Sequence, residues 1–261
     1  MPRGAGLVSS GVRANRPWLT TAAILAVASA GCGRIGYDDA VDAAHDTDAP
    51  TDAPTDAPTD APIDAPTDAA IDARIIKPIH DYRMDDLTDA EGGPDLISKG
   101  GTFGAGGYQF DDDHGLGLIG GLPAQVYTID LQYTPSMLVD FRKLLDFKGR
   151  SSDTGLYTRD AKLSFVILPN VTFAESPAQL QTGTSYQVTM ARDASKHVTA
   201  WIDGQEVFTF DDVDDLAVLP TPTDPLELFM DDVVTGGGEA AYGVVRRIRI
   251  YDEALIAAPP L

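Results

Sequence analysis

The sequence has a single cysteine, Cys32, so no disulfide bond within the chain can support its fold. Basic residues are also scarce, with 19 Lys and Arg against 40 Asp and Glu. The resulting formal net charge of −21 argues against nucleic acid and anionic lipid headgroups as partners, because both repel an acidic surface. Beyond the first 31 residues, no apolar run is long enough to cross a membrane. The folded part must therefore be stabilised by burial alone.

The one apolar run, Trp18 to Ala30, has the pattern of an export signal. Arg3, Arg13 and Arg16 precede it, and small residues follow it. A basic region, a short apolar region and a small-residue exit are typical of a signal peptide. The run has 13 residues, whereas a membrane-spanning helix needs about 20. We predict that residues 1–31 are a cleaved signal peptide.

Cys32 follows Ser29-Ala30-Gly31, and this tetrapeptide resembles the lipobox of bacterial lipoproteins, with Ser29 where that family usually has Leu. The resemblance implies a diacylglyceryl group on the Cys32 sulfur, and hence an exported protein that meets the membrane only through its lipid anchor. The residue after the cysteine is Gly33 rather than Asp, and in this the sequence resembles lipoproteins that are sent to the outer membrane. An ordinary signal peptide with an incidental cysteine is the alternative. After cleavage, 16 basic and 40 acidic residues leave a net charge of −24.

Residues 32–75 contain a four-residue repeat, TDAP, that continues as IDAP, TDAA and IDAR. Five prolines exclude a helix there, and 11 aspartates between Asp38 and Asp72 meet no basic residue. We predict a disordered acidic linker. Glycosylation of its threonines and loose calcium binding along its aspartates are the alternatives to a plain solvated spacer.

Residues 76–261 alternate apolar and polar side chains in short runs, which is typical of strands with one buried face. Tyr127, Ile129, Leu131 and Tyr133 share one face, and Val244, Ile248 and Ile250 close the series. Similar alternation occurs around residues 163–167, 186–190 and 198–202. Many short strands without a long helical stretch favour a sandwich or jelly roll.

Two segments test this interpretation more closely. Asp203-Gly204 separates two alternating runs and predicts a two-residue hairpin turn, since both turn residues need positive φ. Residues 136–147 space their apolar side chains partly like a helix. The stretch from Lys143 to Phe147 also suits a strand beside a bulge, and we favour the strand.

Residues 185–211, SYQVTMARDASKHVTAWIDGQEVFTFD, resemble the paired strands of laminin G-like domains. The segment GVVRRIRIYDEAL, residues 243–255, is similar to the closing strand of the same superfamily, and GGPDLISKGGTF, residues 92–103, resembles one bacterial branch of it. The resemblance covers roughly residues 80–255. It implies a concanavalin A-like jelly-roll sandwich of two antiparallel sheets.

Some members of this superfamily are glycanases whose catalytic strand carries Glu-x-Asp-x-x-Glu or a version one residue shorter. Here Thr128 and Gln132 stand where the two glutamates would flank Asp130. Glycoside hydrolysis needs two carboxyl groups beside the scissile bond, and neither Thr nor Gln supplies one. The four histidines also lack partners at metal-ligand spacing. We therefore predict no catalytic residue.

Two weaker site candidates remain. Trp201 is a possible sugar platform, although we favour a buried position for it. Asp231 and Asp232, between an apolar run and a glycine loop, are candidate calcium ligands, since relatives often hold such an ion and calcium prefers loop carboxylates and carbonyls. Solvated loop charge is the alternative.

The sequence as a whole predicts a lipid-anchored bacterial surface protein whose laminin G-like domain, residues 76–261, binds a glycan or protein outside the cytoplasm. A structural or assembly role in the envelope without a discrete ligand is the first alternative. A hydrolase with an unrecognised site is the second.

Overall fold

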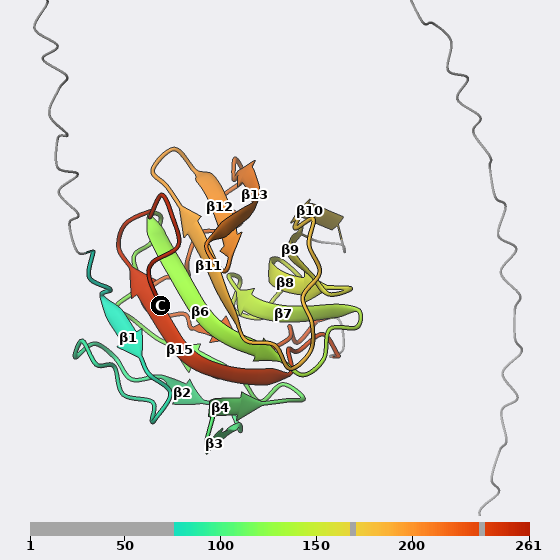
Figure 1. Ribbon diagram of the computed structural model, residues 1–261. Helices are drawn as coiled ribbons and strands as arrows, with labels where there is room; N and C mark the ends of the chain where they lie inside the picture. The colour runs from blue at the N-terminus through green and yellow to red at the C-terminus, as the bar shows by residue number, and fades with distance from the viewer. Residues whose placement is uncertain (1–75, 168–170, 235–237) are drawn as a thin grey trace, which may run out of the picture. The chain divides into compact units, whose positions relative to one another are not determined.

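The computed structural model describes residues 76–167, 171–234 and 238–261, and all the regular structure in these ranges is β-strand (Figure 1). The described residues form fifteen strands, which pair into two antiparallel sheets. The predicted all-β jelly-roll sandwich is thereby confirmed. Cys32 and the predicted signal peptide and linker lie outside the described residues. Within the described ranges, no helix has the length and apolar character needed to span a membrane.

The larger sheet has the strand order β13-β12-β11-β6-β15-β4-β3, and β1 also pairs with β15. Its strands are β1 (His80–Tyr82), β3 (Thr102–Gly104), β4 (Gly107–Phe110), β6 (Tyr127–Pro135), β11 (Tyr186–Arg192), β12 (His197–Ile202), β13 (Gln205–Asp211) and β15 (Gly243–Tyr251).

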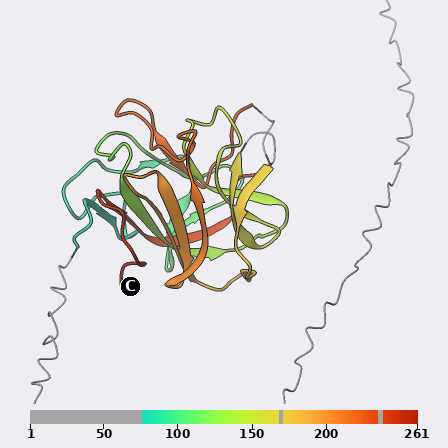
Figure 2. The same ribbon diagram turned by 90° about the horizontal axis from the view of Figure 1, so that it is seen from above.

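The smaller sheet has the order β10-β9-β8-β7-β14-β5-β2. Its strands are β2 (Ile97–Ser98), β5 (Leu116–Leu118), β7 (Phe141–Asp146), β8 (Gly155–Arg159), β9 (Lys162–Ile167), β10 (Val171–Glu175) and β14 (Leu226–Leu228). Viewed from above, its edge strand β10 lies beside the orange strands of the larger sheet (Figure 2). Phe173 of β10 meets Phe210 of β13 edge-on, with ring centroids 5.0 Å apart. The two sheets therefore approach each other at this side.

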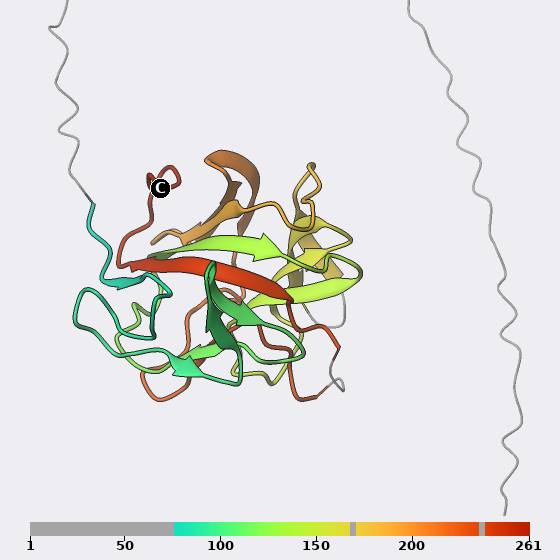
Figure 3. The ribbon, with the colours of Figure 1, turned by 60° about the horizontal axis from the view of Figure 1, so that its bottom comes forward.

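β6 and β15 are the longest strands and run side by side through the centre of the larger sheet (Figure 3). β6 keeps the alternation expected from its sequence, but β15 has a bulge between Val245 and Arg247. The bulge shifts the side-chain alternation, so that Val245 is buried in the core together with Ile248 and Ile250. The expectation that Val244 shares their face was therefore wrong.

Residues 141–146 form a strand, as favoured over a helix, and the predicted bulge is there. The pairing of β7 with β8 shifts between Lys143 and Leu145. As a result Leu144 and Leu145, although adjacent, are both buried in the core.

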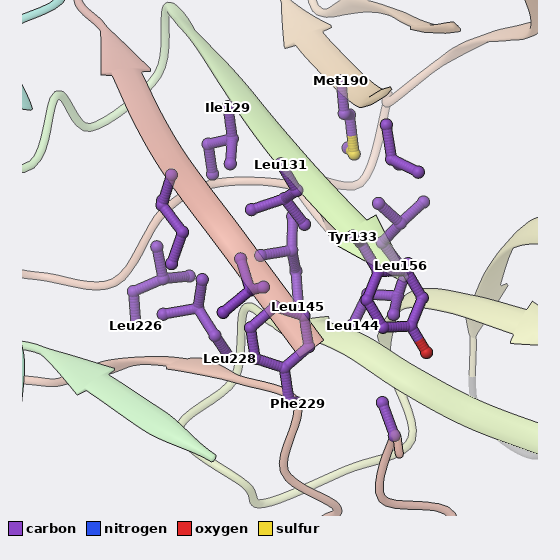
Figure 4. Packing of buried hydrophobic residues seen from close by; sticks show 14 of the residues in the cluster. Ile129, Leu131, Tyr133, Leu144, Leu145, Leu156, Met190, Leu226, Leu228 and Phe229 are labelled. Carbon is purple, nitrogen blue, oxygen red and sulfur yellow. The ribbon is translucent and has the colours of Figure 1, made fainter. Parts of the chain in front are cut away.

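The core lies between the facing sheets (Figure 4). Leu131 and Tyr133 of the larger sheet face Leu144, Leu145 and Leu228 of the smaller one. Phe229, which follows β14, stacks on Phe110 with ring centroids 4.0 Å apart. This aromatic contact joins the end of β14 to the end of β4.

The Asp203-Gly204 turn is confirmed. β12 and β13 pair antiparallel, with Ile202 opposite Gln205, so two residues form the connection. Both have positive φ, 50° at Asp203 and 77° at Gly204. The Asp203 carboxylate also accepts the Gln187 N–H at 2.8 Å, which ties the turn to β11.

Candidate functional site

Trp201 lies on the outer face of the larger sheet, because its neighbours Ala200 and Ile202 point into the core. Only 5% of Trp201 is exposed. It lines a small cleft of about 260 Å³ with Thr199 and with residues 254–256, which follow β15. The indole is thus buried, as favoured, and offers almost no ring face to a ligand.

Asp231 and Asp232 hold the loop that leads from β14 to β15. The two oxygens of Asp231 accept the backbone N–H groups of Asp232, at 2.8 Å, and Glu239, at 3.0 Å. Asp232 accepts the N–H of Val234 at 2.6 Å. No three His, Cys, Asp or Glu side chains in the described ranges are grouped to hold a metal ion. Calcium at Asp231 and Asp232 remains a prediction.

A buried ionic cluster surrounds this loop. Burial, followed by the charges of Asp231 and Asp153, raises the pKa of Glu239 to about 7. Lys143 is fully buried, and its Nζ donates to Asp146 Oδ2 and to a backbone carbonyl, each at 2.9 Å. The Lys143 ammonium group therefore already supplies a positive charge to this acidic cluster.

Asp130, on the strand that lacks the glycanase glutamates, is also committed to neighbouring side chains. Its Oδ2 accepts two hydrogen bonds from Arg249, and its Oδ1 accepts one from Thr189 at 2.6 Å and one from Gln187 at 2.9 Å. Asp130 is 1% exposed. Its lone pairs are occupied, so the carboxylate is not presented to a ligand.

Residues 252–261 cover this network on the outer face of the larger sheet. The Pro259 carbonyl accepts a hydrogen bond from Gln187, and the Pro260 carbonyl accepts one from Arg249, each at 2.7 Å. Thr128 is bound on both sides: its hydroxyl donates to the Glu253 carbonyl and accepts the Leu255 N–H. The face of β6 that carries Thr128 and Asp130 is therefore covered by the C-terminal segment.

The best candidate site is a cleft of about 490 Å³ where β4 and β6 end and β15 begins. Pairing of β15 with both β4 and β6 brings together segments that are far apart in sequence. The lining residues are Gly100, Gly101, Thr102, Gln109, Phe110, Asp111, His114, Ser136, Tyr242, Gly243 and Val244.

The polar groups of this cleft have few bonds within the protein. His114 Nδ1 and Asp111 Oδ1 are 3.0 Å apart, which leaves the second atom of each group, Nε2 and Oδ2, for a ligand. Within the described part of the chain, no side-chain hydrogen bond occupies Thr102, Gln109 or the Tyr242 hydroxyl. Among the described residues, Ser136 likewise makes a hydrogen bond only through its backbone N–H, which leaves its hydroxyl for a ligand. Such convergent groups are a feature of ligand sites.

Tyr242 is held firmly at the wall. Its carbonyl accepts the Ser136 N–H at 2.9 Å and the Tyr133 hydroxyl at 3.1 Å. The Arg142 guanidinium lies over its ring, 5.5 Å from the centroid, and also donates to the Gly238 carbonyl. The aromatic ring is thereby positioned before any ligand arrives.

Two glycines allow close packing in the opposite wall of the cleft. A Cβ at Gly100 would meet the His114 ring at 2.5 Å, and one at Gly101 would meet the Gln109 carbonyl at 2.4 Å. Gly100 also has a φ of 123°, which larger residues rarely adopt. Gly100-Gly101 lead into the hairpin that β3 and β4 form.

A larger cavity, of about 520 Å³, lies near Phe147 and Pro225. Its polar groups are already bonded to one another. Lys148 donates to the Asp215 carbonyl at 3.0 Å, and Thr221 bonds to Asp224 at 2.7 Å. Because fewer groups are left for a ligand, volume alone does not identify the site.

Sequence reasoning did not find the cleft residues. The only local signal was the i, i+3 spacing of Asp111 and His114. His80 and His197 also have aspartate partners, Asp89 at 2.7 Å and Asp211 at 2.8 Å, which the sequence did not indicate.

No protein-family model and no curated protein sequence matches the chain. Solved structures share its fold at low identity. The binding domain of Paraclostridial Mosquitocidal Protein 1 has a TM-score of 0.50 at 10% identity, over 68% of this chain and 49% of that one. A Trypanosoma rangeli sialidase in complex with 2,3-difluorosialic acid has a TM-score of 0.50 at 14% identity, over 64% of this chain and 28% of that one.

A third match is a Ruminococcus gnavus IT-sialidase CBM40 bound to α2,3-sialyllactose, with a TM-score of 0.45 and 18% identity. The matched region covers 61% of this chain and 92% of that one. By contrast, the chain spans less than a third of the Trypanosoma sialidase and about half of the toxin domain. At these identities the likeness concerns the jelly-roll β-sandwich alone.

Proposed function

We propose that this protein is a lipid-anchored bacterial surface protein whose laminin G-like sandwich binds a glycan without catalysis. The binding site is the cleft between the ends of β4 and β6 and the start of β15. Cys32 carries the lipid, and residues 32–75 separate the anchor from the domain.

The observation that carries the proposal is the set of uncommitted polar groups in the cleft beside a fixed aromatic ring. Gln109 and His114 supply a donor and acceptor array, and Tyr242 supplies a ring against which a sugar could lie. Sugars present many hydroxyl groups, each both a donor and an acceptor, so they need partners of this mixed kind.

The fold is compatible with this proposal and does not choose among ligands. It occurs in a toxin's binding domain and as part of a sialidase. The residues of β6 support a non-catalytic role, because Thr128 and Gln132 stand where a glycanase would have carboxylates and Asp130 is bound to Arg249.

The test is a glycan array probed with the mature chain, residues 33–261, made without its lipid. We expect binding to a subset of glycans. Gln109→Ala and Tyr242→Ala should each weaken binding about tenfold, the effect of losing one to two kcal/mol of contact. Thr221→Ala, in the larger cavity, is the matched control and should leave binding unchanged.

Two other outcomes point to the alternatives. Binding to no glycan on the array, with a folded protein, would favour a structural or assembly role. Release of reducing sugar from a bound glycan would favour a hydrolase.

A further inference from the structure

The chemistry of the cleft points to one class of ligand. We infer that it takes a neutral glycan, recognised through hydroxyl groups, rather than one bearing a carboxylate or sulfate. This inference rests on the proposed function, and it adds the charge of the ligand.

The part of the cleft wall that the structure describes carries no fixed positive charge. None of the described residues that line it is Lys or Arg. Its imidazole, His114, faces the Asp111 carboxylate at 3.0 Å, so any positive charge on the ring is balanced by a neighbour. Protein sites for sugar or phosphate anions rely on Arg or Lys, often with two parallel hydrogen bonds.

The cations around the cleft are mostly bound to other groups. Arg142 lies over Tyr242 and donates to the Gly238 carbonyl. Lys99 pairs with Glu227 at 3.6 Å. Arg150 pairs with Asp113 and donates to the Asp231 carbonyl. None of the three can turn into the cleft without breaking these contacts.

Arg246 is the exception and therefore the decisive residue. It is exposed, and its guanidinium lies beside Gly106, as does the cleft residue Val244. If the ligand were anionic, Arg246 would be its natural anchor. If the ligand is neutral, Arg246 contributes little.

The charge of the whole domain favours the neutral ligand. Residues 76–261 contain 14 basic and 29 acidic residues, a net charge of −15. Asp111 lines the cleft and Asp112 follows it in the same loop, whereas the charge of Asp113 is paired with Arg150. The field of Asp111 and Asp112 extends about 8–10 Å at ordinary salt and lowers the local concentration of anions.

The free groups match hydroxyls. Asp111 Oδ2 accepts, Gln109 both donates and accepts, and the Thr102, Ser136 and Tyr242 hydroxyls do both. Neighbouring hydroxyls on a sugar ring can bind one carboxylate and one amide together. A ligand carboxylate would instead face the Asp111 carboxylate and be repelled.

The experiment compares neutral and sialylated glycans on the mature chain by calorimetry, with lactose and α2,3-sialyllactose as the first pair and further matched pairs from the array. We expect the neutral member of each pair to bind at least as tightly. Its Kd should change less than about twofold between low and high salt, because no ion pair forms. Arg246→Ala should change Kd less than about twofold, and Asp111→Asn should raise it about tenfold.

Tighter binding of the sialylated members, lost at high salt or with Arg246→Ala, would overturn this inference while leaving the glycan proposal intact. Binding to neither member of any pair would overturn the proposed function, and the inference with it. Circular dichroism of both variants separates loss of binding from loss of folding.

Discussion

Arg249 binds one oxygen of Asp130 through two of its nitrogens, at 2.8 and 3.0 Å, and both side chains are buried. The pair joins β6 to β15 at the centre of the larger sheet. Removing one partner would leave a buried charge without compensation.

Asp130→Asn is therefore expected to lower the free energy of unfolding by about 3–5 kcal/mol. Denaturant unfolding of the mature chain measures this. Glu175→Gln is the matched control, because Glu175 pairs with Lys162 at the surface, where such a pair contributes about 1 kcal/mol or less. Replacing Asp130 and Arg249 together by Leu should recover much of the loss. Equal small effects of Asp130→Asn and Glu175→Gln would contradict the interpretation.

The turn between β12 and β13 gives a second prediction. Gly204 has a φ of 77°, which a β-branched residue adopts only with strain. Gly204→Val should destabilise the domain by more than about 1 kcal/mol in thermal or denaturant unfolding. Thr209→Val on β13 introduces the same side chain at an exposed strand position and should have little effect. A neutral Gly204→Val would mean that the turn relaxes freely.

The third prediction concerns pH. Burial and the charges of Asp231 and Asp153 raise the pKa of Glu239 to about 7, above the ordinary value of 4.5. Between these two values the folded protein holds a proton that the unfolded chain has released. Stability should therefore fall as pH rises from about 5 to about 8, by roughly 1–2 kcal/mol after allowance for partial exposure.

Glu239→Gln should remove that slope, as measured by urea midpoints across the pH range. At lower pH the dependence has the opposite sign, because there stability falls as pH falls. Hydrogen bonds from His80 and from backbone N–H groups outweigh the effect of burial and lower the pKa of Asp89 below 3.8. Its contribution is lost as pH falls below about 4. A slope that persists in Glu239→Gln would assign the effect to another group.

The lipid anchor is the fourth prediction. Stable membrane attachment needs more than one acyl chain, which a lipidated Cys32 would supply. Cys32→Ser should move the protein out of the membrane fraction or leave it unprocessed, as seen by cell fractionation and detergent partitioning. Ser29→Leu restores the usual lipobox residue and should keep the protein in membranes. Unchanged fractionation of Cys32→Ser would remove the anchor from the proposal.

Calcium is the fifth. An ion bound by Asp231 and Asp232 would raise the melting temperature, since a ligand of the native state adds about 2.7 kcal/mol at a hundredfold excess over its Kd. Asp232→Asn would then abolish the rise. Equal melting curves in calcium and in chelator would leave these carboxylates as acceptors for the loop N–H groups, in the arrangement that both already have.

The fold could be predicted from the sequence where its causes are local. The alternation of Tyr127 to Tyr133 and the Asp203-Gly204 turn depend on residues next to one another, and both are confirmed. The bulge at Val245 and Arg247 was missed, because it depends on pairing with β6. Its effect is to turn Val244 from the core into the wall of the cleft.

The candidate site was beyond sequence reasoning for the same reason. Gln109, Ser136 and Tyr242 are remote in the chain and meet only because β15 lies between β4 and β6. The candidates chosen from the sequence, Trp201 and Asp231-Asp232, stood out by residue type. In the structure Trp201 is buried, as favoured, and the carboxylates of Asp231 and Asp232 accept hydrogen bonds from loop N–H groups, while calcium binding there stays a prediction.

Residues 259 and 260 contact the buried Asp130 network only through their carbonyl groups in the hydrogen bonds described. Almost any amino acid offers the same carbonyl, so at the exposed position 260 the requirement falls on the backbone, whereas Leu255 and Pro259 are also buried. Homologues of this domain should therefore vary in sequence at the exposed positions of this segment while keeping its length. An insertion or deletion between β15 and residue 259 should be far rarer than a substitution.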